Sequence, residues 1–85
     1  MNQRINSING CITPEAQASY LSQHGHLEGI VVDDHNRDNF ARYYTMNGAG
    51  YKVVFIGGTI AQISKMTESA VKSIIACSEI KFGGF

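Results

Sequence analysis

The residue types that could do chemistry gather in one stretch, where three histidines lie close to several aspartates. The histidines are His24, His26 and His35, and the aspartates fall between residues 33 and 38. Neutral imidazoles and carboxylates are ligands for zinc, nickel or iron, and a His-Gly-His segment on one strand would direct both rings to one face. Paired CxxC and HExxH motifs are absent from the sequence, and aspartates of this kind also satisfy the backbone of a solvated turn. We therefore expect a surface loop here, with no metal and no cofactor.

The same acids and histidines are also the residue types of a general acid and base pair for hydrolysis. The sequence has no nucleophile motif beside them. Its glycine-rich stretch, residues 47–50, leads from one predicted strand into another, whereas a phosphate-binding loop leads into a helix. We therefore expect a protein without catalytic activity.

The clearest local structure is a β-hairpin with arms at residues 40–46 and 51–56. Aromatic and β-branched residues dominate both arms, and the segment between them supplies the asparagine and glycines that hairpin turns need. A four-residue loop at 47–50, or a two-residue turn at Gly48-Ala49, predicts that Met46 lies opposite Tyr51. The alternation of side chains then predicts which residues share a face.

One predicted face is rich in large apolar side chains and is the better candidate for the core. It carries Phe40, Arg42, Tyr44, Met46, Tyr51, Val53 and Phe55. The other face is apolar enough to need a cover, either a helix or a partner molecule. It carries Ala41, Tyr43, Thr45, Lys52, Val54 and Ile56.

Capping signals predict a helix on each side of the strands. Thr13-Pro14 begins the first helix, and Gly25 is expected to end it in the left-handed conformation. Thr67 caps a second helix over residues 68–79, whose apolar side carries Val71, Ile74 and Ile75.

The remaining segments complete the predicted domain. Residues 27–33 form a strand, residues 59–66 are compatible with a strand or a helix, residues 1–11 are a mobile arm or an edge strand, and residues 80–85 suit a short final strand. The expected fold over residues 1–85 is a single small α+β domain. Its antiparallel sheet has three or four strands in a meander around the hairpin, with the C-terminal helix on one face and a short N-terminal helix at the edge.

Residues 59–75 resemble the helix-turn-helix of transcriptional regulators, with a short first helix followed by a polar-capped second one. The resemblance implies a DNA contact through Lys65, Ser69 and Lys72. The turn that separates the helices in that motif is missing, and a strand or loop that leads into a capped core helix explains the same residues.

The hairpin also carries the residue types of a binding surface. Tyrosines with arginine and lysine are typical of protein-binding hot spots, and they also suit an aromatic sheet face that stacks single-stranded bases. We favour a protein partner, with nucleic acid as the alternative. The candidate contact residues are Arg42, Tyr43, Tyr44, Tyr51, Lys52 and Val54.

Composition narrows the class of protein further. The chain has 85 residues, 44% of them hydrophobic, and a formal net charge of zero, which argues against a general polyanion binder. No apolar run reaches the length of a membrane span, and the two cysteines are expected as free thiols, so we expect a cytoplasmic protein. A small binding module of this kind suits an inhibitor or modulator of a larger host assembly, of phage or mobile-element type, and a homodimer is a close second reading.

Overall fold

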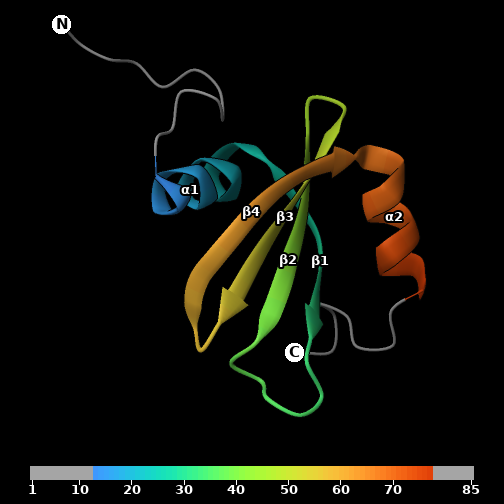
Figure 1. Ribbon diagram of the computed structural model, residues 1–85. Coiled ribbons are helices and arrows are strands. Elements are labelled where there is room, and N and C mark those ends of the chain that lie inside the picture. Colours follow the sequence, from blue (N-terminus) through green and yellow to red (C-terminus); the bar gives the residue numbers. More distant parts are fainter. Residues whose placement is uncertain (1–12, 78–85) are drawn as a thin grey trace, which may run out of the picture.

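The computed structural model describes residues 13–77, which form a four-stranded antiparallel sheet with a helix on each side (Figure 1). The small α+β meander predicted from the sequence is confirmed, and it has the larger of the two expected strand numbers. The predictions for residues 1–11 and 80–85 lie outside the described residues. The elements in chain order are α1 (Pro14–His24), β1 (His26–Val32), β2 (Phe40–Met46), β3 (Ala49–Ile56), β4 (Thr59–Thr67) and α2 (Glu68–Cys77).

Two tight turns join the three C-terminal strands of the sheet. Asn47-Gly48 connects β2 to β3, and Gly57-Gly58 connects β3 to β4. All four residues have positive φ, at 53°, 82°, 62° and 82°. Two consecutive residues of this kind make the hairpin turn whose twist matches the twist of the flanking strands. The sequence of the turns therefore explains the meander.

The predicted register of the β2–β3 hairpin is wrong by two residues. Met46 pairs with Ala49, and Tyr51 pairs with Tyr44 rather than with Met46. The turn forms one residue earlier than predicted because asparagine tolerates the left-handed conformation far better than alanine does. A shift of two residues leaves each side chain on its original face, so the predicted composition of both faces is confirmed.

The two faces of the sheet are named here after the helices that pack on them. The α1 face carries Ile30, Val32, Phe40, Arg42, Tyr44, Tyr51, Val53 and Phe55. The α2 face carries Gly29, Val31, Ala41, Tyr43, Thr45, Gly50, Lys52, Val54 and Ile56.

Helix α1 anchors itself to the α1 face through one leucine. Thr13 caps the helix by accepting a hydrogen bond from the Ala16 N–H at 3.1 Å, as predicted. Leu21 is fully buried against Tyr44 and the other core residues of the central strands, so the helix lies over the sheet rather than at its edge. The predicted left-handed cap at Gly25 is wrong.

The residue that ends α1 is extended, with φ −90° and ψ 176°. The Gly25 N–H nevertheless donates to the Leu21 carbonyl at 2.8 Å. A Cβ atom at Gly25 would lie 2.8 Å from that carbonyl oxygen. Glycine is therefore required here by close backbone contact and not by its φ angle.

Helix α2 follows β4 directly and turns back over the opposite face. Thr67 caps it through a 3.0 Å hydrogen bond from the Ala70 N–H. Val71 is fully buried and packs above Gly50, where a Cβ would lie 2.5 Å from a Val71 methyl. Ile75 packs in the same way above Gly29. Glycines on two strands thus let this helix approach the sheet closely.

Residues 59–66 belong to strand β4, which leads into the capped helix α2, so the reading of a strand before a capped helix is confirmed and the helix-turn-helix resemblance is wrong. The Gly57-Gly58 turn folds this segment back along β3, where it pairs along most of its length. The apolar spacing of Ile60, Ile63 and Met66 looks helical in sequence, but a β-bulge between Ile60 and Gln62 places Ile60 and Ile63 on the α1 face, and Met66 opposite Gly50 lies on the α2 face.

Both helices cover the same half of the sheet. In Figure 1 they flank the half that contains the β2–β3 turn, here called the covered end. The other half contains the loop of residues 33–39 and the β3–β4 turn, and none of the helices in residues 13–77 lies over it. We call this half the open end.

Candidate functional site

The open end is held in shape by the loop between β1 and β2. The Asn39 side chain accepts a 2.9 Å hydrogen bond from the Gly57 N–H, and the Asp38 carbonyl accepts one of 2.9 Å from the Gly58 N–H. Within the loop, the Asp33 carboxylate accepts from the His35 N–H at 2.8 Å. The Asn39 side chain and the Asp38 backbone carbonyl thus fix the loop to the β3–β4 turn, and the Asp33 side chain satisfies backbone within the loop, as expected for a solvated turn.

An arginine stacked on two phenylalanines forms the centre of the open end on the α1 face. Phe40 and Phe55 pair across β2 and β3, with ring centroids 4.5 Å apart and an interplanar angle of 12°. The guanidinium carbon of Arg42 lies 5.0 Å from the centroid of Phe55 and 5.7 Å from that of Phe40. This is the geometry of cation–π contacts, which stabilise a guanidinium where water is partly excluded.

A pocket of about 210 Å³ opens beside this stack. Ile30 and Val32 of β1 form an apolar wall, and Arg37 of the loop is a second arginine that lines the pocket. The pocket and the stack together are called the arginine patch. Its residues are Ile30, Val32, Arg37, Phe40, Arg42 and Phe55.

The electrostatics of the arginine patch are unbalanced. The Nε atom of Arg42 is buried and has no hydrogen-bond acceptor in the part of the chain that the structure describes. Within residues 13–77, neither Arg42 nor Arg37 forms an ion pair with a carboxylate. A buried donor without an acceptor costs about 1–3 kcal/mol, and natural proteins keep few of them. The patch therefore combines positive charge with an unsatisfied hydrogen-bond donor beside apolar side chains.

The three tyrosines predicted as contact residues belong to the interior. Tyr44 and Tyr51 pair beneath α1, with 5% and 6% of their surface exposed, and Tyr43 on the other face is 5% exposed. This burial corrects their assignment as exposed contacts, because a partner reaches almost none of their surface. Of the predicted binding residues on the α1 face, only Arg42 lies at the open end.

A second hollow, of about 290 Å³, lies at the open end toward the α2 face and includes two other predicted contact residues. Lys52 and Val54 are half-buried there, and the Lys52 ammonium lies 6.0 Å from the ring centroid of Tyr43. Ile56 beside them is 55% exposed. The predicted protein-binding residues thus divide between two opposite faces and do not form one surface.

The residues of the alternative nucleic-acid site are also separated. Lys65 pairs with Tyr51 in the sheet and lies on the α1 face, whereas Ser69 and Lys72 belong to α2 on the opposite side. Lys72 forms an ion pair of 3.7 Å with Glu68, four residues earlier in the helix. These cations do not make a continuous basic surface.

The histidines predicted as weak metal candidates do not converge. His24 ends α1 with its ring 4.5 Å from that of Tyr20, His26 begins β1, and His35 lies in the exposed loop at the other end of the sheet. The described residues hold no group of three metal-ligating side chains close enough to bind one ion.

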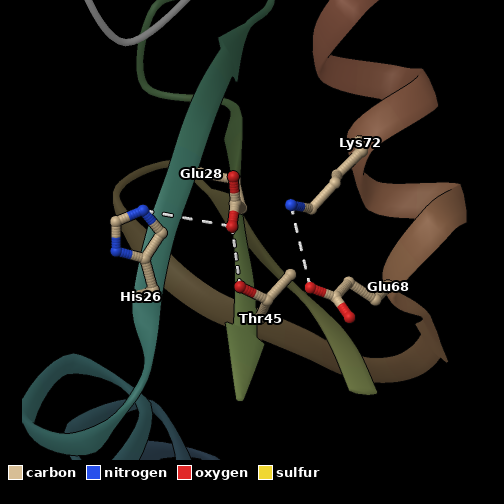
Figure 2. Close-up of polar contacts among 5 residues, drawn as sticks. All are labelled: His26, Glu28, Thr45, Glu68 and Lys72. Carbon is tan, nitrogen blue, oxygen red and sulfur yellow. Dashed lines mark hydrogen bonds and ion pairs between the residues drawn. The ribbon is translucent and has the colours of Figure 1, made fainter. Parts of the chain in front are cut away.

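Polar contacts near His26 have a structural explanation. Thr45 donates a 2.7 Å hydrogen bond to the Glu28 carboxylate, which lies 4.0 Å from His26 Nε2. Figure 2 shows these residues beside the ion pair of Glu68 and Lys72 on α2. Glu28 lies where the pairing of β1 with β2 is interrupted by a bulge, so its carboxylate satisfies a buried threonine beneath the helix.

Sequence reasoning missed most of the arginine patch. The sequence pattern places Phe40 and Phe55 on the core candidate face and gives the loop residue Arg37 no distinguishing feature. Their pairing follows from the register, and a correct Asn47-Gly48 turn would have placed the two phenylalanines opposite each other. The convergence of Arg37 depends on the loop hydrogen bonds and has no local sequence signal.

Comparison of the chain with family models, with curated proteins and with solved structures gave no match. Within residues 13–77, both helices are too short to cross a membrane. The candidate site is therefore defined by its geometry alone.

Proposed function

We propose that the chain is a small, non-enzymatic protein-binding module whose contact surface is centred on the arginine patch. The observation that carries the proposal is the Arg42 guanidinium, which lies against two phenylalanine rings with its Nε buried and without an acceptor. Arginine and aromatic residues beside an apolar pocket are the composition of interface hot spots. A module of this size suits the inhibition or modulation of a larger assembly, as expected for a phage or mobile-element protein.

The energetics of Arg42 favour a role in binding over a role in folding. Its contacts with Phe40 and Phe55 contribute about 0.5–1 kcal/mol each at a partly exposed site, whereas the buried Nε without an acceptor costs about 1–3 kcal/mol. The two terms nearly cancel, so the arginine adds little to folding. An acceptor supplied by a partner would remove the cost and retain the gain.

The hollow toward the α2 face is the weaker candidate. Its central cation, Lys52, already lies over Tyr43, and its other polar lining residues, Asp33 and Asn39, are already engaged in hydrogen bonds of the loop and the turn. Such a surface excludes water without orienting a partner. The arginine patch combines an apolar wall with two charged groups that fix direction, as binding pockets do.

Capture of partners from the native host tests the proposal. The wild-type chain, Arg42→Met and Phe55→Ala would be used as immobilised baits, with Lys65→Met as the control, since Lys65 is an exposed cation on the same face but at the covered end. We expect one set of proteins to be retained by the wild type and by Lys65→Met and to be lost from the two patch variants. Equal retention by all four baits would contradict the proposal.

A nucleic-acid ligand is the competing outcome of the same experiment. Arginine beside aromatic rings on a sheet is also a surface on which bases stack, but Phe40 and Phe55 already stack on each other. Digestion of the captured material with nuclease distinguishes the cases. Retention of proteins after digestion supports the protein-binding proposal, and recovery of nucleic acid whose binding falls steeply with salt would replace it.

A further inference from the structure

We infer that the arginine patch recognises a carboxylate, carried by an aspartate or glutamate with an apolar neighbour on the partner protein. This inference rests on the proposed function and adds the chemistry of the group that is bound. Its basis is the juxtaposition of two arginines with an apolar wall in one pocket, where Arg42 Nε has no acceptor among residues 13–77.

The geometry of a guanidinium explains why the missing acceptor matters. Arginine binds a carboxylate through two parallel N–H groups, either both terminal ones or Nε together with one terminal nitrogen. Nε of Arg42 makes no hydrogen bond within residues 13–77 and is screened from solvent. A carboxylate bound side-on reaches it only after the edge of the guanidinium turns toward the pocket, and it would then satisfy a donor that the fold leaves unsatisfied, with Arg37 on the rim holding the same group from the loop.

The stack beneath Arg42 prepares the side chain for this role. Contacts with Phe40 and Phe55 restrict the guanidinium before any ligand arrives, so less conformational entropy is lost on binding. Ile30 and Val32 exclude water from one side of the pocket, which strengthens a charged hydrogen bond. The stack thus holds the guanidinium beside the pocket before the ligand arrives.

The apolar walls favour a carboxylate over a phosphate. A carboxylate carries one charge and two acceptor oxygens, which match one guanidinium fork, and an aliphatic neighbour can lie on Ile30. A phosphate group carries more charge, and its dehydration against an isoleucine and a valine is more costly. The pocket volume of about 210 Å³ suits a side chain rather than a folded surface.

Acidic residues of the chain itself lie near the patch but do not neutralise it. The loop that carries Arg37 also carries Asp33, Asp34 and Asp38, all of them exposed. None of these carboxylates lies within 4.0 Å of a guanidinium nitrogen in the described residues. Asp33 is engaged with the loop backbone. The charge of the two arginines therefore remains available.

The test is a titration of the full chain with a matched pair of peptides, acetyl-Leu-Glu-Leu-amide and acetyl-Leu-Gln-Leu-amide. The two peptides differ in one charge and have nearly the same shape. Nuclear magnetic resonance of the arginine Nε–H groups observes the inferred contact directly. We expect the glutamate peptide to shift the Arg42 Nε–H signal and to bind about tenfold more tightly than the glutamine peptide, because a hydrogen bond between charged groups is lost in the latter.

Variants distinguish recognition of the carboxylate from general binding to the arginine patch. Arg42→Met should abolish the preference for glutamate, Arg42→Lys should restore less than half of it because lysine lacks the fork, and Lys65→Met should leave it unchanged. Equal binding of both peptides, with shifts at Phe40 and Phe55, would overturn the carboxylate inference and leave the protein-binding proposal standing. No shift of the Arg42 Nε–H signal at the highest peptide concentration would also overturn it.

Two further arms identify other sources of an anion. A short single-stranded oligothymidylate that shifts the Arg42 signal more than the glutamate peptide does would replace the carboxylate by a phosphate. Sedimentation equilibrium of the chain alone tests whether a second copy inserts one of its loop aspartates. A monomer supports a separate partner, and a dimer that Arg42→Met dissociates would overturn that assignment.

Discussion

The two ends of the sheet carry the same kind of aromatic pair on the same face and use it differently. Tyr44 and Tyr51 pair at the covered end, where Leu21 of α1 buries them. Phe40 and Phe55 pair at the open end, where the side chain over them is Arg42. Strand pairing therefore creates both pairs, and the element above each pair decides whether it becomes core or surface.

Helix length explains why one end is left open. Helix α2 has 10 residues and spans about 15 Å, whereas β3 has 8 residues and spans about 26 Å. Because α2 starts at the covered end and runs along the sheet, it ends before it reaches the β3–β4 turn (Figure 1). In the described residues, the open end is thus a consequence of short helices on longer strands.

The largest effect predicted by this comparison is the loss of Leu21. Leu21→Ala removes the one fully buried side chain that joins α1 to the tyrosine pair, and it should lower the free energy of unfolding by about 2–5 kcal/mol. Urea unfolding followed by circular dichroism measures the change. Leu27→Ala on β1, which is half-buried and packs at the margin of the same cluster, is the control and should cost less. Equal costs would show that α1 does not make the difference between the two ends.

The next effect concerns the glycines beneath α2. A Cβ at Gly50 would lie 2.6 Å from the Thr67 carbonyl oxygen, which is backbone, so Gly50→Ala should shift the helix and cost about 1–3 kcal/mol. A Cβ at Gly29 meets the end of the Ile75 side chain at 2.7 Å, which can rotate away. Gly29→Ala should therefore cost less than Gly50→Ala in the same unfolding measurement. The reverse order would contradict the described packing of α2.

Much of the covered end is visible in the sequence because its signals are local. Thr13 and Thr67 predict where the helices begin. The Asn-Gly and Gly-Gly pairs predict the turns, and β-branched and aromatic residues predict the strands. The composition of each face follows from simple alternation. The predicted register is wrong because a two-residue turn at Gly48-Ala49 would put Ala49 in the left-handed conformation, which Asn47 adopts more easily.

The open end is harder to predict from the sequence because its accessibility depends on where the two helices end. Nothing in the sequence around Tyr44 or Phe40 distinguishes an aromatic residue that a helix will cover from one that stays accessible. The position of α1 is set by Leu21, a single apolar residue in a weakly amphipathic helix. Arg42 is the only charged residue on its predicted face, and a charge among large apolar side chains is the sequence signal of the patch.

A third prediction concerns Arg42, where stability and binding should change separately. Arg42→Met removes the buried Nε without an acceptor and also removes the contacts with Phe40 and Phe55, so the free energy of unfolding should stay within about 1 kcal/mol of the wild type. Binding of the captured partner, measured by calorimetry, should weaken by at least about tenfold. A loss of stability as large as that of Leu21→Ala would mean that the arginine serves the core.

The smallest effect is expected at the most exposed large apolar side chain of the described residues. Ile56 ends β3 at the open end, is 55% exposed and lies on the α2 face beyond the helix. Ile56→Ser should therefore change the free energy of unfolding by less than about 0.5 kcal/mol, as surface substitutions do. Val53→Ser is the matched control, because Val53 on the same strand is 1% exposed and should cost several times more.

If Ile56→Ser instead costs more than about 1 kcal/mol, the α2 face is covered in solution at this end. A midpoint of unfolding that rises with protein concentration would then identify the cover as a second copy of the chain, because dissociation of a dimer depends on concentration and local packing does not.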